Sequence, residues 1–138
     1  MVAAFVLDAS VAAAWCFADE ATDASRALHD SLADRSAIVP LIWHAECTNL
    51  LLVAERRRRV SAAQCDELLG LLNMLPVQTE PETSRLHDPI MRLARTHNLT
   101  VYDAIYLDLA MRFGVALATR DGELRRAAKA ERLELIDV

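Results

Sequence analysis

The stretch Ala3-Ala4-Phe5-Val6-Leu7-Asp8-Ala9-Ser10 decides the fold of this 138-residue chain. It is an apolar run without charge that ends abruptly in the carboxylate of Asp8. Such a run predicts a strand buried on both faces, at the centre of a parallel sheet. Asp8 would then lie at the carboxyl edge of the sheet, where open α/β folds place their sites. The alternative is that Asp8 caps a helix that begins near Ser10.

The composition indicates one helix-rich globular domain over residues 1–138. Apolar residues make up 54% of the chain, which excludes a disordered protein. The net charge of −5 does not indicate a nucleic-acid binder, although an acidic metal site would itself supply several of these charges. The N-terminus lacks the basic leader of a signal peptide, and no stretch approaches the ~20 uncharged residues of a membrane span. We therefore expect a cytoplasmic protein without membrane contact.

The three cysteines, Cys16, Cys47 and Cys65, fit the same compartment. They form no C-x-x-C pair, and each lies in an apolar helical pattern. We expect small reduced core residues, as in cytosolic proteins.

Strands alternate with helices along the rest of the chain. Further strands are expected at 37–40, weakly at 77–79, at 115–119 and, as an edge strand, at 133–136. Helices are expected at 10–17, 22–33, 43–59, 61–72, 83–97, 102–113 and 123–130, with Pro89 marking a kink or a late start. This alternation predicts an α/β fold with a central parallel sheet and helices on both faces.

Four acids from four separated segments follow strand ends or begin helices. Asp8 ends the first strand, Glu46 lies in the first turn of the helix after the second strand, Asp103 opens a helix, and Asp121 follows the strand that ends at residue 119. Each acid alone could be a cap or a partner of the helix dipole. Gathered at one sheet edge, however, four carboxylates would raise one another's pKa unless a cation lies among them.

An all-oxygen ligand set suits Mg²⁺ or Mn²⁺. Magnesium keeps several waters, which leaves room for a phosphate. The matching chemistry is metal-assisted hydrolysis of a phosphodiester, in which one ion activates the attacking water and a second ion, roughly 3.5–4 Å away, stabilises the leaving oxygen. In-line attack by water predicts a 5′-phosphate product rather than a 2′,3′-cyclic phosphate.

Four short motifs in this order resemble PIN-domain ribonucleases, specifically the VapC toxins of bacterial toxin–antitoxin pairs. The motifs are VLDAS at 6–10, Pro40 and Trp43 with ECTNLL at 46–51, TVYDAIY at 100–106, and LATRDGEL at 117–124. The resemblance covers nearly the whole chain. It implies a PIN-like three-layer fold with a parallel sheet in the order 3-2-1-4-5, and a Mg²⁺- or Mn²⁺-dependent endoribonuclease. The implied partners are RNA of the tRNA or rRNA class, a cognate VapB-like antitoxin and a second copy in a homodimer.

The resemblance also implies roles for individual residues. The positions that match the family's catalytic, metal-binding acids are Asp8, Glu46, Asp103 and Asp121, the last of which would hold a second ion or waters. Ser10 and Thr119 would orient a carboxylate or a water, and Asn49, one turn below Glu46, would steady the site. Glu123 is either an outer acid of the site or a plain acid at a helix start.

Several side chains near the acids are candidates for RNA contact. Arg120, Arg125 and Arg126 lie close to Asp121 in sequence and could hold the RNA backbone. Trp43, beside Glu46, is expected to line the groove. The arginine run at 56–59 is open to two interpretations, phosphate contacts or a solvated helix end.

Rival functions make different demands on the sequence. A PIN-fold binding or scaffold module would not need all four acids. A phosphoacceptor or phosphatase built on Asp8 would place a second acid or a lysine close to the nucleophile, and Ala9 and Ser10 offer neither. A zinc deaminase would pair the H-x-E of residues 44–46 with a P-C-x-x-C motif, which this sequence lacks.

Overall fold

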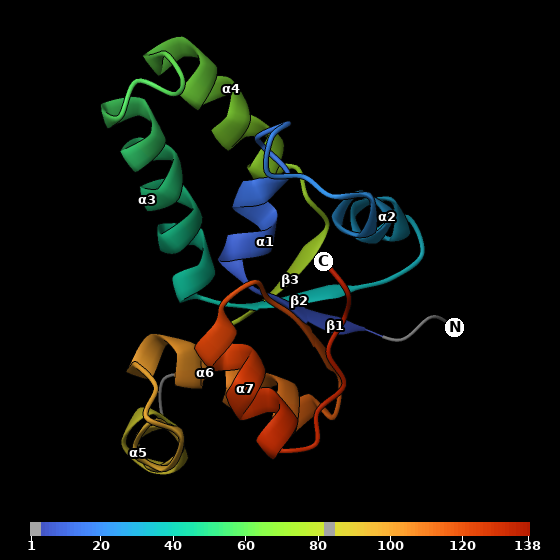
Figure 1. Cartoon of the computed structure of the whole chain (residues 1–138), viewed down its shortest axis with the longest axis vertical. Helices are drawn as coiled ribbons and strands as arrows, with labels where there is room; N and C mark the ends of the chain where they lie inside the picture. The colour runs from blue at the N-terminus through green and yellow to red at the C-terminus, as the bar shows by residue number, and fades with distance from the viewer. Residues whose placement is uncertain (1–3, 82–84) are drawn as a thin grey trace.

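The computed structural model describes residues 4–81 and 85–138. Within these residues, parallel strands form one sheet in the order β3-β2-β1-β4 (Figure 1). The strands are β1 (Phe5–Leu7), β2 (Ala37–Pro40), β3 (Val77–Glu80) and β4 (Ala116–Ala118). The predicted α/β class with a central parallel sheet is confirmed, and so is the expected order of these four strands.

Helices cover both faces of the sheet. They are α1 (Ala9–Ala14), α2 (Asp23–Ser31), α3 (Ile42–Arg56), α4 (Ala62–Asn73), α5 (Met91–His97), α6 (Val101–Phe113) and α7 (Gly122–Ala130), with an irregular turn η1 (Leu86–Ile90) before α5. Figure 1 shows α1, α3 and α4 on one side of the strands and α5, α6 and α7 on the other. Helix α6 packs on β1, β2 and β4, while α1 packs on α3. No helix in the described ranges is long and apolar enough to cross a membrane.

Strand β1 is the centre of the sheet. Its three residues are fully buried, and it pairs with β2 on one side and β4 on the other, with Val6 opposite both Ile38 and Leu117. This position explains the uncharged N-terminal run, because both faces of β1 meet helices and both edges meet strands. Parallel pairing brings the carboxyl ends of β1, β2 and β4 to the same edge.

The strand expected at 133–136 is reduced to a single bridge. Leu135 lies parallel to Leu117, whose N–H donates to the Glu134 carbonyl at 2.9 Å and whose carbonyl accepts from Ile136 N–H at 3.0 Å. The segment therefore occupies the fifth place of the expected order 3-2-1-4-5. Its side chains are only half-buried or exposed, so little apolar surface fixes it as a longer strand.

Helix α3 ends at Arg56, not at residue 59 as expected. Arg58 has a φ of 60°, in the left-handed region, so the helix cannot continue through it. The Arg59 guanidinium lies 4.2 Å from the centre of the Phe17 ring and pairs with Glu20 at 2.8 Å. This arginine therefore connects two loops, while Arg56 keeps its expected place in the last turn of α3.

Helix α5 begins at Met91, so Pro89 marks a late start, one of the two expected alternatives. Asp88 before it is extended, with a φ of −166°, and proline disfavours a helical conformation in the preceding residue. Residues 82–84, where the expected helix begins, lie outside the described residues.

Candidate active site

Asp8 lies directly after β1 and is only 6% exposed. Its N–H donates to the Ala118 carbonyl at 2.9 Å. Its carboxylate oxygen Oδ2 accepts hydrogen bonds from Ser10 Oγ at 2.8 Å and from Thr119 Oγ1 at 2.6 Å. Asp8 occupies the N-cap position of α1 but makes no side-chain capping hydrogen bond there. The carboxylate is thus committed to the edge between β1 and β4, and not to capping the helix.

Ser10 and Thr119 tie the loop after β4 to Asp8. The Ser10 hydroxyl accepts from Arg120 N–H at 3.2 Å, and the buried Thr119 hydroxyl accepts from Asp121 N–H at 3.1 Å. Because each hydroxyl has one proton, and each accepts from an amide, that proton is directed to Asp8. This is the geometry expected of side chains that orient an ionised carboxylate.

Glu46 is half-buried and lies in the second turn of α3, because the helix begins at Ile42 and has no acid in its first turn. Its oxygen Oε1 accepts a hydrogen bond from the Tyr106 hydroxyl at 2.7 Å. Tyr106 comes from α6 and is 0% exposed. Tyr106 was not among the site residues predicted from the sequence. The available signal was its i, i+3 spacing from Asp103, which puts both side chains on one face of α6.

Asp103 and Asp121 lie at the starts of two helices. Thr100, not Asp103, caps α6, and its hydroxyl accepts from the Asp103 N–H at 3.1 Å. Asp121 does cap α7, since its Oδ1 accepts from Leu124 N–H at 2.9 Å. The capping interpretation is therefore right for one oxygen of Asp121, whereas the Asp103 carboxylate caps nothing.

The four acids form one electrostatic group. Burial raises the pKa of Asp8 despite its hydrogen bonds from Thr119 and Ser10. Burial, with the charges of Asp8 and Asp103, also raises the pKa of Glu46, against the effect of the Tyr106 hydrogen bond. Burial and the charges of Asp121 and Asp8 raise the pKa of Asp103 to about 6. No arginine or lysine in the described ranges pairs with any of the four, so their repulsion is left uncompensated.

This set of donors fits a hard divalent cation by its chemistry. All the donors are carboxylate oxygens, which Mg²⁺ and Mn²⁺ prefer. In residues 4–81 and 85–138, however, no three Asp, Glu, His or Cys side chains are already grouped around one point. A cation here would be held partly through its own waters, which Mg²⁺ usually retains.

Two of the expected site residues make no hydrogen bond to the acids among the residues that the structure describes. Asn49 is exposed, and its side chain makes no hydrogen bond to any residue that the structure describes. Trp43 is only 2% exposed and packs edge-on against the His44 ring, with centroids 4.9 Å apart. The expectation that Trp43 lines a groove is therefore wrong, because its ring belongs to the core beneath α3.

Two arginines lie beside the loop that holds Asp8 and Asp121. Arg125 Nη1 donates to the Thr119 carbonyl at 2.9 Å, so its charge is held near the acids. Arg120 is half-buried, and one of its guanidinium nitrogens, Nη2, is buried without a hydrogen-bond partner among the residues that the structure describes. An unsatisfied buried donor is costly, which makes Arg120 a candidate for contact with an anion.

The Arg126 side chain makes its contacts within the protein. Its Nη2 donates to the His97 carbonyl at 2.6 Å and pairs with Glu123 at 2.8 Å. Of the two interpretations of Glu123, this ion pair favours the plain acid at a helix start.

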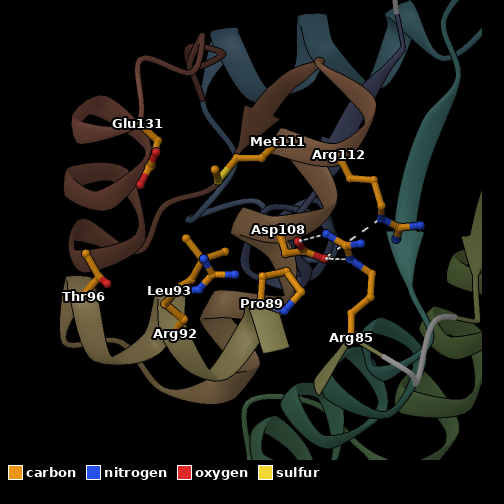
Figure 2. Close-up of a pocket in the computed structure, with 9 residues that line it drawn as sticks. All are labelled: Arg85, Pro89, Arg92, Leu93, Thr96, Asp108, Met111, Arg112 and Glu131. Atoms are coloured by element: carbon orange, nitrogen blue, oxygen red, sulfur yellow. Dashed lines mark hydrogen bonds and ion pairs between the residues drawn. The ribbon is translucent and has the colours of Figure 1, made fainter. Parts of the chain in front are cut away.

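A cavity of about 440 Å³ lies between α5 and α6, away from the four acids (Figure 2). Figure 2 shows Asp108 facing Arg85, which donates two hydrogen bonds of 2.8 Å to its carboxylate, with Arg112 at 4.0 Å. Arg92, on the rim, pairs with Asp88 at 2.8 Å. The charges around this cavity are compensated within the protein, unlike those of the acid group.

Comparison with known proteins agrees with this architecture. Solved structures of similar fold include PAE2754 from Pyrobaculum aerophilum (24% identity, TM-score 0.75, 99% of this chain and 91% of that chain) and FitAcB from Neisseria gonorrhoeae (18%, 0.67, 96% and 96%). A third is Mycobacterium tuberculosis VapC20, a sarcin–ricin loop cleaving toxin (17%, 0.64, 89% and 94%). No curated protein matches the sequence. The PIN domain family model matches residues 5–130, and the chain therefore belongs to the PIN domain family.

Proposed function

We propose that this protein is a Mg²⁺- or Mn²⁺-dependent endoribonuclease of the VapC type, a toxin that a cognate antitoxin neutralises. The observation that carries the proposal is the gathering of four acids, from four separate segments, with no basic partner among the described residues. Repulsion between neighbouring carboxylates, of which Asp8 is buried and Glu46 and Asp103 are half-buried, destabilises the fold, so its presence points to a functional site. Membership of the PIN domain family supports the nuclease class, and the likeness to VapC20 supports the toxin class.

Asp8, Glu46 and Asp103 would hold the cation directly or through water, and Asp121 would hold a second ion or waters. When bound, the cation would lower the pKa of an attacking water and offset charge on the phosphate. The protein's own contribution is orientation. Both hydroxyls that reach Asp8 bind the same oxygen, Oδ2, which favours the ionised carboxylate against the effect of burial and fixes it at the end of β1.

Arg120 and Arg125 are the candidates for holding the RNA backbone. Arg120 follows Thr119 in the chain, and Arg125 donates to the Thr119 carbonyl, so both belong to or contact the loop after β4 that carries Asp121. Contacts with phosphates would position RNA without selecting a sequence, and this arrangement is compatible with a tRNA or rRNA substrate. Attack by water in line with the leaving oxygen would leave a 5′-phosphate on one fragment.

The decisive experiment is cleavage of total bacterial RNA by the purified protein, with Mg²⁺ or Mn²⁺ against EDTA. We expect discrete fragments that require the metal and vanish in Asp8→Asn, while Glu67→Gln, an exposed acid on α4, cuts like the wild type. Mapping of the fragment ends would give the target and the phosphate position. No cleavage by folded, metal-loaded protein across several RNA pools would overturn the proposal in favour of a PIN-fold scaffold.

The proposal extends to protein partners. A VapC-like protein is expected to form a cytoplasmic homodimer and to be silenced by a VapB-like antitoxin that brings an apolar segment and a basic side chain. Light scattering of the purified protein tests the dimer. Loss of RNA cleavage on titration with the product of an adjacent small gene tests the antitoxin.

A further inference from the structure

We propose that Tyr106 is a positioning residue whose hydroxyl holds the Glu46 carboxylate in one orientation beside Asp8, and so sets the affinity of the acid group for a divalent cation. The inference rests on the proposed function, because it concerns how the same acids are held. It assigns a role in that function to Tyr106, a buried residue of α6.

The direction of the hydrogen bond follows from its partners. The Tyr106 hydroxyl lies 2.7 Å from Glu46 Oε1, a short distance of the kind found when a hydroxyl donates to an ionised carboxylate. Because an ionised carboxylate can only accept, the proton shared between these two side chains is that of the Tyr106 hydroxyl.

Glu46 needs such an anchor more than its neighbours do. It is half-buried on a flexible side chain, and Asp8 and Asp103 both repel its charge. Without a donor, repulsion and rotamer freedom would both favour turning the carboxylate out to water. Tyr106 therefore does for Glu46 what Ser10 and Thr119 do for Asp8.

Helix α6 then has two tasks at the site. It supplies the acid Asp103, and three residues later on the same face it supplies the donor that fixes the acid of α3. The rigid helix sets the spacing between these two side chains, and Tyr106 is 0% exposed, so its ring cannot move freely. The position of Glu46 is thus tied to the position of Asp103.

The test compares Tyr106→Phe with Tyr102→Phe. Tyr102 lies one turn earlier on α6, is 58% exposed, and has a hydroxyl without a hydrogen bond to any described residue, so it is a matched control. The readout is Mn²⁺ affinity, measured by titration calorimetry on folded protein in the absence of RNA. We expect Y106F to bind Mn²⁺ about 10-fold more weakly, as for other residues that orient metal ligands, and Y102F to match the wild type.

Making Y106F in a second variant distinguishes a role in orienting Glu46 from a role in core packing. In Glu46→Gln, which lacks the charge that Tyr106 would orient, Y106F should cause no further loss of Mn²⁺ affinity. If Y106F does not fold, Glu46→Asp replaces it, because the shorter carboxylate cannot reach the hydroxyl, and it should show the same loss.

Two results would overturn the inference. One is Mn²⁺ binding by Y106F, or by E46D, as tight as that of the wild type. The other is an equal loss from Y106F in the wild-type and E46Q backgrounds, which would assign the effect to packing. Both leave the proposed function standing, whereas a wild-type protein that neither binds Mn²⁺ nor cuts RNA overturns the proposed function and this inference together.

Discussion

Helix α6 carries two aspartates, Asp103 and Asp108, whose surroundings are opposite. Asp108 is almost completely buried, yet Arg85 binds both of its oxygens at 2.8 Å (Figure 2). Asp103 is less buried, but its charged neighbours are Asp121 and Asp8, and their charges help to raise its pKa to about 6. The two residues have the same chemistry and belong to the same helix, so the difference comes from what the tertiary fold places beside them.

The comparison separates a structural acid, Asp108, from an acid of the proposed site, Asp103. A buried carboxylate that is paired with an arginine is neutralised, and its removal takes that ion pair away from the arginine. A carboxylate surrounded by other carboxylates keeps its place despite their repulsion, so its removal should increase the stability of the fold. Activity and stability should therefore respond to the two aspartates in opposite ways.

The largest expected effect is on RNA cleavage. Asp103→Asn should lower the single-turnover rate on a labelled RNA at least ~100-fold, which corresponds to about 2.7 kcal/mol of lost transition-state stabilisation. Asp108→Asn should leave the rate per folded molecule within about threefold of the wild type, because its carboxylate faces Arg85 and not the acid group. Equal losses in the two variants would remove the distinction between them.

The next largest effect is on stability, where Asp108→Asn should be more damaging than Asp103→Asn. Asp108→Asn should lower the free energy of unfolding by about 2 kcal/mol in urea, below the cost of breaking a fully buried pair, because the Arg85 side chain is 32% exposed and can be hydrated. Asp66→Asn, an exposed acid on α4, is the control and should stay near the wild type. A wild-type urea midpoint for D108N would show that this ion pair contributes nothing.

A smaller effect concerns pH. The pKa of Asp103 in the folded protein is about 6, above its ordinary value of 3.8, so folding favours the protonated form. Stabilisation from this group is fully present below its unfolded pKa and is lost as the pH rises through about 6. Between about pH 5 and pH 7.5, the melting temperature of metal-free wild type should fall relative to Asp103→Asn.

A bound divalent cation should reverse the loss of stability that ionised Asp103 causes. Saturating Mg²⁺ at about pH 7.5 should raise the melting temperature of the wild type by a few degrees, and that of D103N by less. Parallel pH profiles for the two metal-free proteins would contradict the assignment of this titration to Asp103.

The smallest effect tests whether pairing alone marks a structural acid. Glu123 lies two residues after Asp121 but is bound to Arg126 at 2.8 Å. Glu123→Gln should therefore change the cleavage rate less than twofold. A loss as large as that of D103N would place Glu123 in the site and would show that an ion pair can hide a functional acid.

Local sequence patterns predicted most of the architecture. The uncharged run before Asp8 marked the central strand, Ser61 caps α4 through Gln64 N–H, and Gly114 ends α6 with a φ of 63°. These features depend on a residue and its near neighbours, which the sequence shows directly. The four acids were identifiable because each follows a strand or lies near the start of a helix.

The contacts that give these acids their character are not local. Tyr106 is 60 residues from Glu46, and Arg85 is 23 residues from Asp108. Periodicity indicates which face of a helix is buried, but not which side chain of another helix it meets. The same limit explains the error at Trp43, whose neighbour Glu46 is close in sequence although the indole points into the core.

The bond between Asp8 and Thr119 spans 111 residues, and β1 pairs with β4 across the same interval. During synthesis, β1 leaves the ribosome long before β4, the strand that pairs with it, has been made. A nascent or truncated chain therefore has Asp8 but neither the hydroxyl of Thr119 nor the acid of Asp121. Contacts of such long sequence separation also form late in folding. For the proposed nuclease, this order of assembly means that the group of four acids is incomplete in every nascent chain until residues through Asp121 have been made.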